Sequence, residues 1–258
     1  MTRASYVLVT GASRGLGKYF AAALAQRKEN LVLVARSIDR LEEVAKKLRS
    51  AHGISVETIS IDLARSNAGR DLARELSARD LAIDLLVNNA GFGDHGEFVK
   101  LSLHRQLEII RLQNSTVVEL THELLPAMIE QGRGGIINVS SMAGFQPIPY
   151  ATIYSATKSF LTTFSLALEA EVHSHGINVV TLCPGRLRAD PDEPITAERK
   201  KVPGGEQAHE DVVWQALEVL DRGGGLVIPG AANKFVAFAE RFVPRGKLAR
   251  LVARMSPK

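Results

Sequence analysis

Seven short runs of apolar, often β-branched residues recur along this chain of 258 residues, and patterns typical of amphipathic helices separate them. The runs are continuously apolar rather than alternating with polar residues, which indicates strands buried on both faces of a parallel sheet. Strand followed by helix, repeated in this way, predicts a single α/β domain with a doubly wound, Rossmann-type parallel sheet of about seven strands. The expected strands are residues 6–9, 31–35, 56–61, 85–87, 136–139, 177–182 and 226–228.

The expected helices cover the faces of this sheet. They are residues 16–27, 38–48, 68–78, 103–129, 154–173 and 210–220. The apolar runs are shorter than the roughly 18 to 20 residues that a membrane-spanning helix needs. Residues 186–205 contain three prolines among mixed charges, so a loop is expected there, within a main domain that extends over residues 1–230. Residues 231–258 are expected to form a basic, helical C-terminal extension.

The positive charge of the chain is concentrated in this extension. Residues 234–258 carry seven basic side chains against Glu240 alone, a net charge of +6, whereas the whole chain carries +4. The extension is either a solvated terminal helix or a surface for a membrane, a nucleic acid or an acidic partner. Because the rest of the chain carries −2, we do not expect a nucleic-acid partner.

Cysteine and histidine usage narrows the chemistry further. Cys183 is the only cysteine, which excludes an intrachain disulfide and suits a reducing, cytoplasmic location. We expect it to be a small buried apolar residue. The first five residues lack the apolar segment of a signal peptide. None of the seven histidines has a metal-ligand spacing with a partner, so no metal site is expected.

The turn between the first strand and the first helix is rich in glycine. Its sequence is Thr10-Gly11-Ala12-Ser13-Arg14-Gly15-Leu16-Gly17. Glycines at this spacing let backbone N–H groups approach a pyrophosphate at the N-terminus of a helix. Other tight turns also need glycine, so the motif acquires this meaning only together with the rest of the chain.

Two arginines predict which dinucleotide is bound. A fold that prefers NAD usually has an acidic residue after the second strand, where it binds the ribose 2′-hydroxyl. This chain has Arg36 there, and Arg14 lies in the glycine turn. Two guanidinium groups near one ribose suit a 2′-phosphate through charge-assisted contacts. NADP(H) is therefore the expected cofactor.

Tyr154 and Lys158 share one face of a predicted helix because they are four residues apart. A phenol titrates near pH 10, too high for acid–base work at neutral pH, and a neighbouring ammonium lowers that pKa. Ser141 follows the strand at 136–139, at the carboxyl edge where doubly wound sheets bind ligands. A hydroxyl there can hold a carbonyl oxygen beside the phenol.

Taken with these residues, the chain resembles a classical short-chain dehydrogenase/reductase over roughly residues 5–230. The glycine-rich turn and six further motifs carry the resemblance, in family order and at family spacing. The further motifs are Asp62-Leu63, Asn88-Asn89-Ala90-Gly91, Asn114, Ser140-Ser141, Tyr154-Ser155-Ala156-Thr157-Lys158 and Pro184-Gly185.

The resemblance implies roles for individual residues. Asn114, Ser141, Tyr154 and Lys158 match the catalytic tetrad, and Ser141 rather than Ser140 has the family spacing of thirteen residues before Tyr154. Tyr154 exchanges the proton, Lys158 lowers its pKa and binds the nicotinamide ribose, Ser141 holds the substrate oxygen, and Asn114 anchors a water. The implied cofactor-binding set is Gly11, Ser13, Arg14, Gly15, Leu16, Gly17, Arg36, Asp62, Leu63, Asn88, Asn89, Ala90, Gly91, Tyr154, Lys158, Pro184 and Gly185.

The C-terminal third is similar to a branch of hydroxysteroid dehydrogenases and 3-ketoacyl reductases. That branch implies an apolar or lipid-like carbonyl substrate, and Phe92, Met142, Phe145 and Ile148 are candidates for its pocket. Ordinary core packing explains these four residues equally well. The chain departs from the family at Ala189, where a threonine usually contacts the nicotinamide end of the cofactor, so the contact of that loop is in doubt.

The sequence thus predicts a cytoplasmic NADP(H)-dependent oxidoreductase that reduces a ketone by hydride transfer. Two alternatives stay open. One is a non-catalytic NADP(H)-binding regulator or scaffold, and the other is a lipid carbonyl reductase at a membrane surface that uses Phe235, Phe238 and Phe242. The resemblance also implies a homodimer or homotetramer formed through the helices at 103–129 and 154–173.

Overall fold

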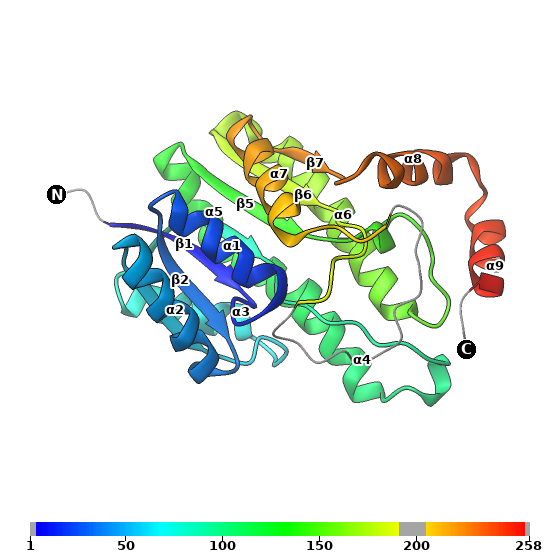
Figure 1. Ribbon diagram of the computed structural model, residues 1–258, viewed down its shortest axis with the longest axis horizontal. Coiled ribbons are helices and arrows are strands. Elements are labelled where there is room, and N and C mark those ends of the chain that lie inside the picture. Colours follow the sequence, from blue (N-terminus) through cyan, green and yellow to red (C-terminus); the bar gives the residue numbers. More distant parts are fainter. Residues whose placement is uncertain (1–3, 191–204, 256–258) are drawn as a thin grey trace.

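The computed structural model describes residues 4–190 and 205–255, and Figure 1 shows their arrangement. Seven parallel strands form one sheet in the order β3-β2-β1-β4-β5-β6-β7. This confirms the predicted doubly wound α/β fold. The strands are β1 (Ser5–Thr10), β2 (Asn30–Ala35), β3 (Val56–Ser60), β4 (Ala82–Asn88), β5 (Gly134–Val139), β6 (Ile177–Leu182) and β7 (Gly225–Val227).

Each expected strand is present, and β4 differs most from its predicted bounds. It begins three residues earlier than expected because Asp84 interrupts the apolar pattern without interrupting the strand. The Asp84 carboxylate lies 3.1 Å from the guanidinium of Arg133, which gives the charged group a partner at the start of β5.

Helices cover both faces of the sheet, as Figure 1 shows. On one face α1 (Gly15–Gln26), α2 (Ile38–His52) and α7 (His209–Asp221) pack onto a buried cluster that includes Phe20 and Leu33. The opposite face carries α3 (Ala68–Ala78), α5 (Thr116–Gln131) and α6 (Thr152–Val172), around a second cluster that includes Leu86 and Leu120. The sheet is therefore apolar on both sides, as continuous apolar runs require.

The helix predicted at 103–129 is divided into three parts. Helix α4 (Leu103–Ile110) is followed by a π-helical turn (Arg111–Ser115) and then by α5. A π-turn accommodates an extra residue within a helix, and such turns occur frequently at functional sites. The π-turn itself contains no glycine or proline that would have indicated this irregularity.

The order of the strands determines where a ligand can bind. Strand β1 pairs with β2 on one side and with β4 on the other. The chain therefore builds the sheet first on one side of β1 and then, from β4 onward, on its other side. A crevice forms outside the carboxyl ends of the strands at such a switch point. The glycine-rich turn follows β1 directly, and the Asn89–Gly91 stretch follows β4.

After β7, helices α8 (Ala231–Ala239) and α9 (Arg245–Met255) extend to one side of the sheet, in orange and red in Figure 1. The side chains of Phe235, Phe238 and Phe242 are 70%, 57% and 73% exposed. Of the predicted loop 186–205, residues 191–204 lie outside the described residues. Nowhere in the described chain is a helix both long and apolar enough to cross a lipid bilayer.

Candidate active site

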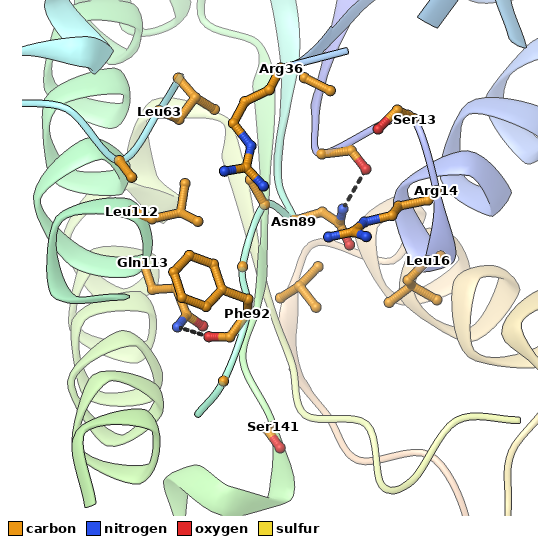
Figure 2. Close-up of a pocket in the computed structure, with 18 of the residues that line it drawn as sticks. Ser13, Arg14, Leu16, Arg36, Leu63, Asn89, Phe92, Leu112, Gln113 and Ser141 are labelled. Carbon is orange, nitrogen blue, oxygen red and sulfur yellow. Dashed lines mark hydrogen bonds between the residues drawn. The ribbon is translucent and has the colours of Figure 1, made fainter. Parts of the chain in front are cut away.

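A cavity of about 570 Å³ lies at the carboxyl edge of the sheet. Figure 2 shows part of its lining, which comes from the turns after β1, β2, β3, β4, β5 and β6, from the π-helical turn and from the start of α6. Most of the residues that the sequence predicts for cofactor binding and catalysis meet there. They are Gly11, Ser13, Arg14, Gly15, Leu16, Arg36, Asp62, Leu63, Asn89, Ala90, Gly91, Ser141, Tyr154, Lys158, Pro184 and Gly185.

The glycine turn is shaped by close packing against the turn after β4. Gly11 has a φ of +67°, which disfavours any other residue, and a Cβ on it would lie 2.9 Å from the Ala90 Cα. A Cβ on Gly17 would collide with the Gly11 carbonyl oxygen. Among the described residues that line the cavity, Gly17 is not included. Its smallness instead lets α1 approach the turn.

Thr10 and Asn89 tie the two turns together. The Thr10 Oγ1 accepts hydrogen bonds from the backbone N–H groups of Asn89 at 2.9 Å and Ala90 at 3.0 Å. In return, the Asn89 side-chain amide donates to the Thr10 carbonyl oxygen at 2.9 Å. These bonds fix the floor of the cavity, where the backbone of the glycine turn must present its N–H groups.

Asn88 is not brought to the cavity, although the sequence predicts it there. Its side chain is buried and donates to the Asn138 Oδ1 at 2.8 Å. The Asn138 amide in turn donates to the Ser165 Oγ at 2.9 Å. Because the side chains of Asn88 and Asn89 point to opposite sides of the extended backbone, only Asn89 reaches the turn. Asn88 therefore links β4, β5 and α6.

Arg14 and Arg36 direct their guanidinium groups toward the same part of the cavity, as Figure 2 shows. Asp62 and Leu63 line the neighbouring wall. The Asp62 carboxylate accepts a hydrogen bond from the Ala64 backbone N–H at 3.0 Å, which holds the turn after β3. Two cations at one end of a large cavity are the donor set that a phosphate requires.

Ser141 lies at the other end of the same cavity in Figure 2, and Tyr154 and Lys158, which also line the cavity, lie beside it. The Lys158 Nζ is 5.8 Å from the centre of the Tyr154 ring and donates to the Val139 carbonyl oxygen at 2.8 Å. The Ser141 Oγ accepts from the Ala143 backbone N–H at 3.1 Å. Its neighbour Ser140 points into the protein and donates to the Lys158 carbonyl oxygen at 2.9 Å. This contrast favours Ser141 over Ser140 for contact with a ligand.

Burial governs the protonation of the pair. It raises the pKa of the Tyr154 phenol above its ordinary value, and the neighbouring Ser141 hydroxyl partly offsets this rise. Burial also lowers the pKa of Lys158 to about 8. The sequence predicts a phenol pKa lowered by the ammonium, but removal of both groups from water has the larger effect. At neutral pH the phenol is therefore protonated and the amine is mostly charged.

Asn114 lies in the π-helical turn between α4 and α5. In the described part of the chain its Oδ1 is buried and has no hydrogen-bond partner, and the residue is not among those that line the cavity. A buried amide oxygen without a partner is costly, and an ordered water is the usual remedy. Asn114 therefore fits a role in which it holds a water.

The four predicted substrate-pocket residues do not lie together. Phe92 lines the large cavity, with the Arg105 guanidinium 3.9 Å above its ring centre. Phe145 and Ile148 instead line a second cavity of about 610 Å³ between the β5–α6 loop and α9. Met142 is not among the described residues that line either cavity. The loop turns its apolar side chains away from Tyr154 toward the C-terminal helix, which the sequence pattern does not reveal.

Sequence reasoning did not select Gln113, which lines the large cavity and is 1% exposed. Its amide donates to the Phe92 carbonyl oxygen at 2.9 Å, a bond drawn in Figure 2. A Cβ on Gly91 would lie 2.9 Å from the Gln113 Oε1. Gln113 thus positions the chain after β4. Its place next to Asn114 in the sequence was the feature that could have identified it.

Gln207 was also missed, since it follows a loop that has no motif. Its Oε1 accepts from the Gly185 backbone N–H at 2.8 Å, and its Nε2 donates to the Pro229 carbonyl oxygen at 2.6 Å. Gln207 therefore fixes the Pro184-Gly185 wall of the cavity.

Cys183 is buried, as expected, with no exposed surface and a pKa raised mainly by burial. In the described part of the chain there is no cluster of three or more His, Cys, Asp or Glu side chains that could hold a metal ion.

Comparison with known proteins gives a consistent result. Residues 5–200 match the family model described as short chain dehydrogenase. The chain is 37% identical over 179 residues to the ketoacyl reductase HetN of Nostoc sp., covering 69% of this chain and 62% of that protein. It is 34% identical over 182 residues to a very-long-chain 3-oxoacyl-CoA reductase of Phaeosphaeria nodorum, covering 69% of this chain and 53% of that protein. It thus spans less than two thirds of either reductase.

A solved structure extends the similarity to nearly the whole chain. It is a short-chain dehydrogenase of Sphingobium yanoikuyae in complex with NADPH, with a TM-score of 0.78 and 30% sequence identity. The similarity covers 98% of this chain and 96% of that one.

Proposed function

The chain belongs to the short-chain dehydrogenase family, and from this premise we propose that it is an NADP(H)-dependent oxidoreductase that reduces the carbonyl of an apolar, lipid-like substrate. One observation carries the proposal. A single cavity has two arginines at one end and the Tyr154, Lys158 and Ser141 side chains at the other. The relatives named as ketoacyl and 3-oxoacyl-CoA reductases, and the neighbour in complex with NADPH, support it.

The residues of the cavity fit a dinucleotide. Backbone N–H groups of the glycine turn suit a pyrophosphate, the walls at Asp62 and Leu63 suit an adenine, and Arg14 and Arg36 suit a 2′-phosphate. When bound, the nicotinamide supplies the hydride. The protein supplies the geometry and the proton.

In the reductive direction, the protonated Tyr154 hydroxyl gives its proton to the carbonyl oxygen of the substrate as that oxygen gains negative charge. The Ser141 hydroxyl donates a hydrogen bond to the same oxygen and so stabilises this charge. The charged Lys158 stabilises the phenolate that remains. The Asn114 amide oxygen holds a water through which the proton is replaced. The raised pKa of Tyr154 keeps the phenol in its proton-donating form, which favours reduction at neutral pH.

The proposal is tested by following NADPH oxidation with 3-ketoacyl thioesters, ketosteroids, quinones and small ketones. We expect turnover with at least one class, and Tyr154→Phe should lower kcat by roughly 10²- to 10⁴-fold, the usual contribution of a positioned acid. Tyr150→Phe is the matched control, since it removes a hydroxyl from the loop just before α6, and it should retain activity. Tight NADPH binding without turnover of any carbonyl would favour the non-catalytic regulator instead.

The cofactor preference has its own test. Arg36→Ala should weaken NADPH binding by roughly 10-fold or more, as expected for a lost charge-assisted hydrogen bond, and should leave NADH binding unchanged. Fluorescence titration with each nucleotide measures both affinities. Lys46→Ala removes an exposed cation from the same region of the chain and should alter neither. Equal losses for NADH and NADPH would contradict a 2′-phosphate site.

A second candidate, a lipid carbonyl reductase bound at a membrane surface, is favoured by the C-terminal helices. Exposed Phe235, Phe238 and Phe242 lie among basic residues, a pattern typical of interfacial helices. Flotation with anionic vesicles should recover the chain, whereas the triple Phe→Ser variant and zwitterionic vesicles should not. Recovery in neither lipid would leave the extension as a solvated helix pair.

A further inference from the structure

The helix that follows the glycine turn has no cap from its own sequence. The residue before α1 is Arg14, and its side chain makes no capping hydrogen bond. The first turn of this helix, which is described in full, contains no acidic residue. The first N–H groups of a helix have no partner within it, and the positive end of its dipole attracts an anion. A negatively charged group that stabilises the start of α1 must therefore come from another part of the chain.

That charge comes from Asp190, which is 175 positions later in the chain. The Gly15 backbone N–H donates a hydrogen bond to the Asp190 Oδ2 at 3.0 Å. Asp190 is only 5% exposed. A nearly buried carboxylate on the first N–H of a helix occupies the position that a phosphate oxygen would take.

The segment that ends in Asp190 is held in place on its N-terminal side. The Arg188 backbone N–H donates to the Gln207 carbonyl oxygen at 2.9 Å, and the Gln207 N–H donates to the Arg186 carbonyl oxygen at 2.8 Å. The Gln207 side chain also holds Gly185, as described above. The segment between β6 and Asp190 is therefore bound to Gln207, just before α7. These bonds fix the backbone from which the Asp190 carboxylate reaches Gly15.

Gly15 also lines the large cavity, together with Gly11 and Ser13. A dinucleotide bound there needs the same N–H groups for its pyrophosphate. Two anions cannot share one helix N-terminus without repulsion at short range. We propose that Asp190 is an internal competitor for the pyrophosphate position, so that the dinucleotide must displace its carboxylate and binds more weakly than it otherwise would.

This inference rests on the proposed dinucleotide site, and it adds a determinant of affinity that the motifs of the chain do not contain. A displaced carboxylate that returns to Gly15 also promotes release of the used cofactor, because weaker affinity is expressed mainly as faster dissociation. The competitor and the arginines therefore act in opposite directions. Arg14 and Arg36 strengthen binding through the 2′-phosphate, and Asp190 weakens it at the pyrophosphate.

The test compares ligands with and without a pyrophosphate. Asp190→Asn keeps the size of the side chain and removes its charge, and it should tighten NADPH binding by roughly 3- to 30-fold, the range for a carboxylate at a helix N-terminus. Binding of adenosine 2′-monophosphate, which lacks the pyrophosphate, should not change. The melting temperature of the cofactor-free chain should fall, and inorganic pyrophosphate should raise it more in the variant than in the wild type.

The control is Asp211→Asn, which removes a carboxylate from the first turn of α7 and leaves the cavity untouched. It should affect melting and not NADPH affinity, and Asp190→Glu, which retains the charge, should bind NADPH as the wild type does. If Asp190→Asn does not fold, Asp190→Ser serves in the same assays. Unchanged affinity for both NADPH and pyrophosphate would overturn the inference. Stronger pyrophosphate binding in a chain that binds no NADPH would support the inference while overturning the proposed cofactor.

Discussion

The protonation of single residues in this site depends strongly on how deeply they are buried. Lys158 is 5% exposed, and burial lowers its pKa to about 8, whereas a lysine in water titrates above pH 10. Its ammonium is bound to the Val139 carbonyl oxygen, which favours the charged form. The residue is thus charged at neutral pH and loses its charge in mildly alkaline solution.

We therefore expect NADPH binding to weaken as the pH rises through about 8, because Lys158 is cationic below this value and neutral above it. Titrations between pH 7 and 9.5 should show a decrease of several-fold. Lys158→Met should bind NADPH weakly at all these pH values, and its affinity should not change near pH 8. Tyr154→Phe retains the lysine and should retain the pH dependence. A constant wild-type affinity over this range would contradict the assignment.

Most residues that line the candidate site could be predicted from the sequence, and the exceptions depend on contacts between parts of the chain that are distant in sequence. Arg14, Arg36 and Ser141 were predicted because they follow strand ends that the apolar runs reveal, and Tyr154 was predicted because it stands four residues before Lys158. Gln113, Gln207 and Asp190 act through hydrogen bonds to residues distant in the chain, and no local pattern encodes such contacts. Phe145 and Ile148 were placed near Tyr154 by proximity in sequence, but the loop directs them to α9.

At the scale of elements, strands were easier to predict than helix irregularities. A run of apolar residues indicates a strand directly. The π-turn at Asn114 only changes the spacing of backbone hydrogen bonds over one turn between two α-helices, and the residue pattern does not show this change. The junction of α8 and α9 is another such irregularity. There Glu240, roughly half buried, has a carboxyl oxygen with no hydrogen-bond partner in the described residues, and burial raises its pKa to about 7.

Glu240→Gln should stabilise this junction in a pH-dependent way. The folded state holds the proton of Glu240 more tightly than the unfolded state does. The free energy of unfolding of the wild-type protein therefore falls as the pH rises from about 4.5 to about 7. The variant should therefore melt about 1–2 °C higher than the wild type at pH 8, after allowance for solvent screening, and nearly equally at pH 4.5. Glu43→Gln, an exposed change on α2, should show no such difference. A wild type that melts higher than the variant at pH 8 would contradict this account.

For the whole molecule, the exposed apolar side chains of α4, α5 and α6 indicate assembly. Leu103, Leu107, Val118, Phe160 and Leu166 are 69%, 38%, 37%, 44% and 38% exposed. Apolar groups gathered on neighbouring helices favour burial against another chain. A second copy presenting the same helices satisfies both partners at once through two-fold symmetry.

We predict a homodimer or homotetramer in solution through these helices. Phe160→Glu places a charge in the contact and should shift the mass toward the monomer in light scattering after size-exclusion chromatography. Phe235→Glu, on the C-terminal extension, should leave the mass unchanged. Dissociation by Phe235→Glu alone would instead assign the assembly to the extension.

The pairing of β1 with β4 has a consequence for how the chain acquires its shape during synthesis. The edge of β1 that receives β4 stays open while β2, β3 and their helices are made, and the cavity lacks a wall until residues 184–187 follow β6. A nascent chain that ends before this point presents unpaired strand edges, which are prone to aggregation. The nucleotide cannot rescue such a chain, since its binding surfaces do not yet face one another. A ligand of the cavity can therefore stabilise the fold only at the last step of synthesis.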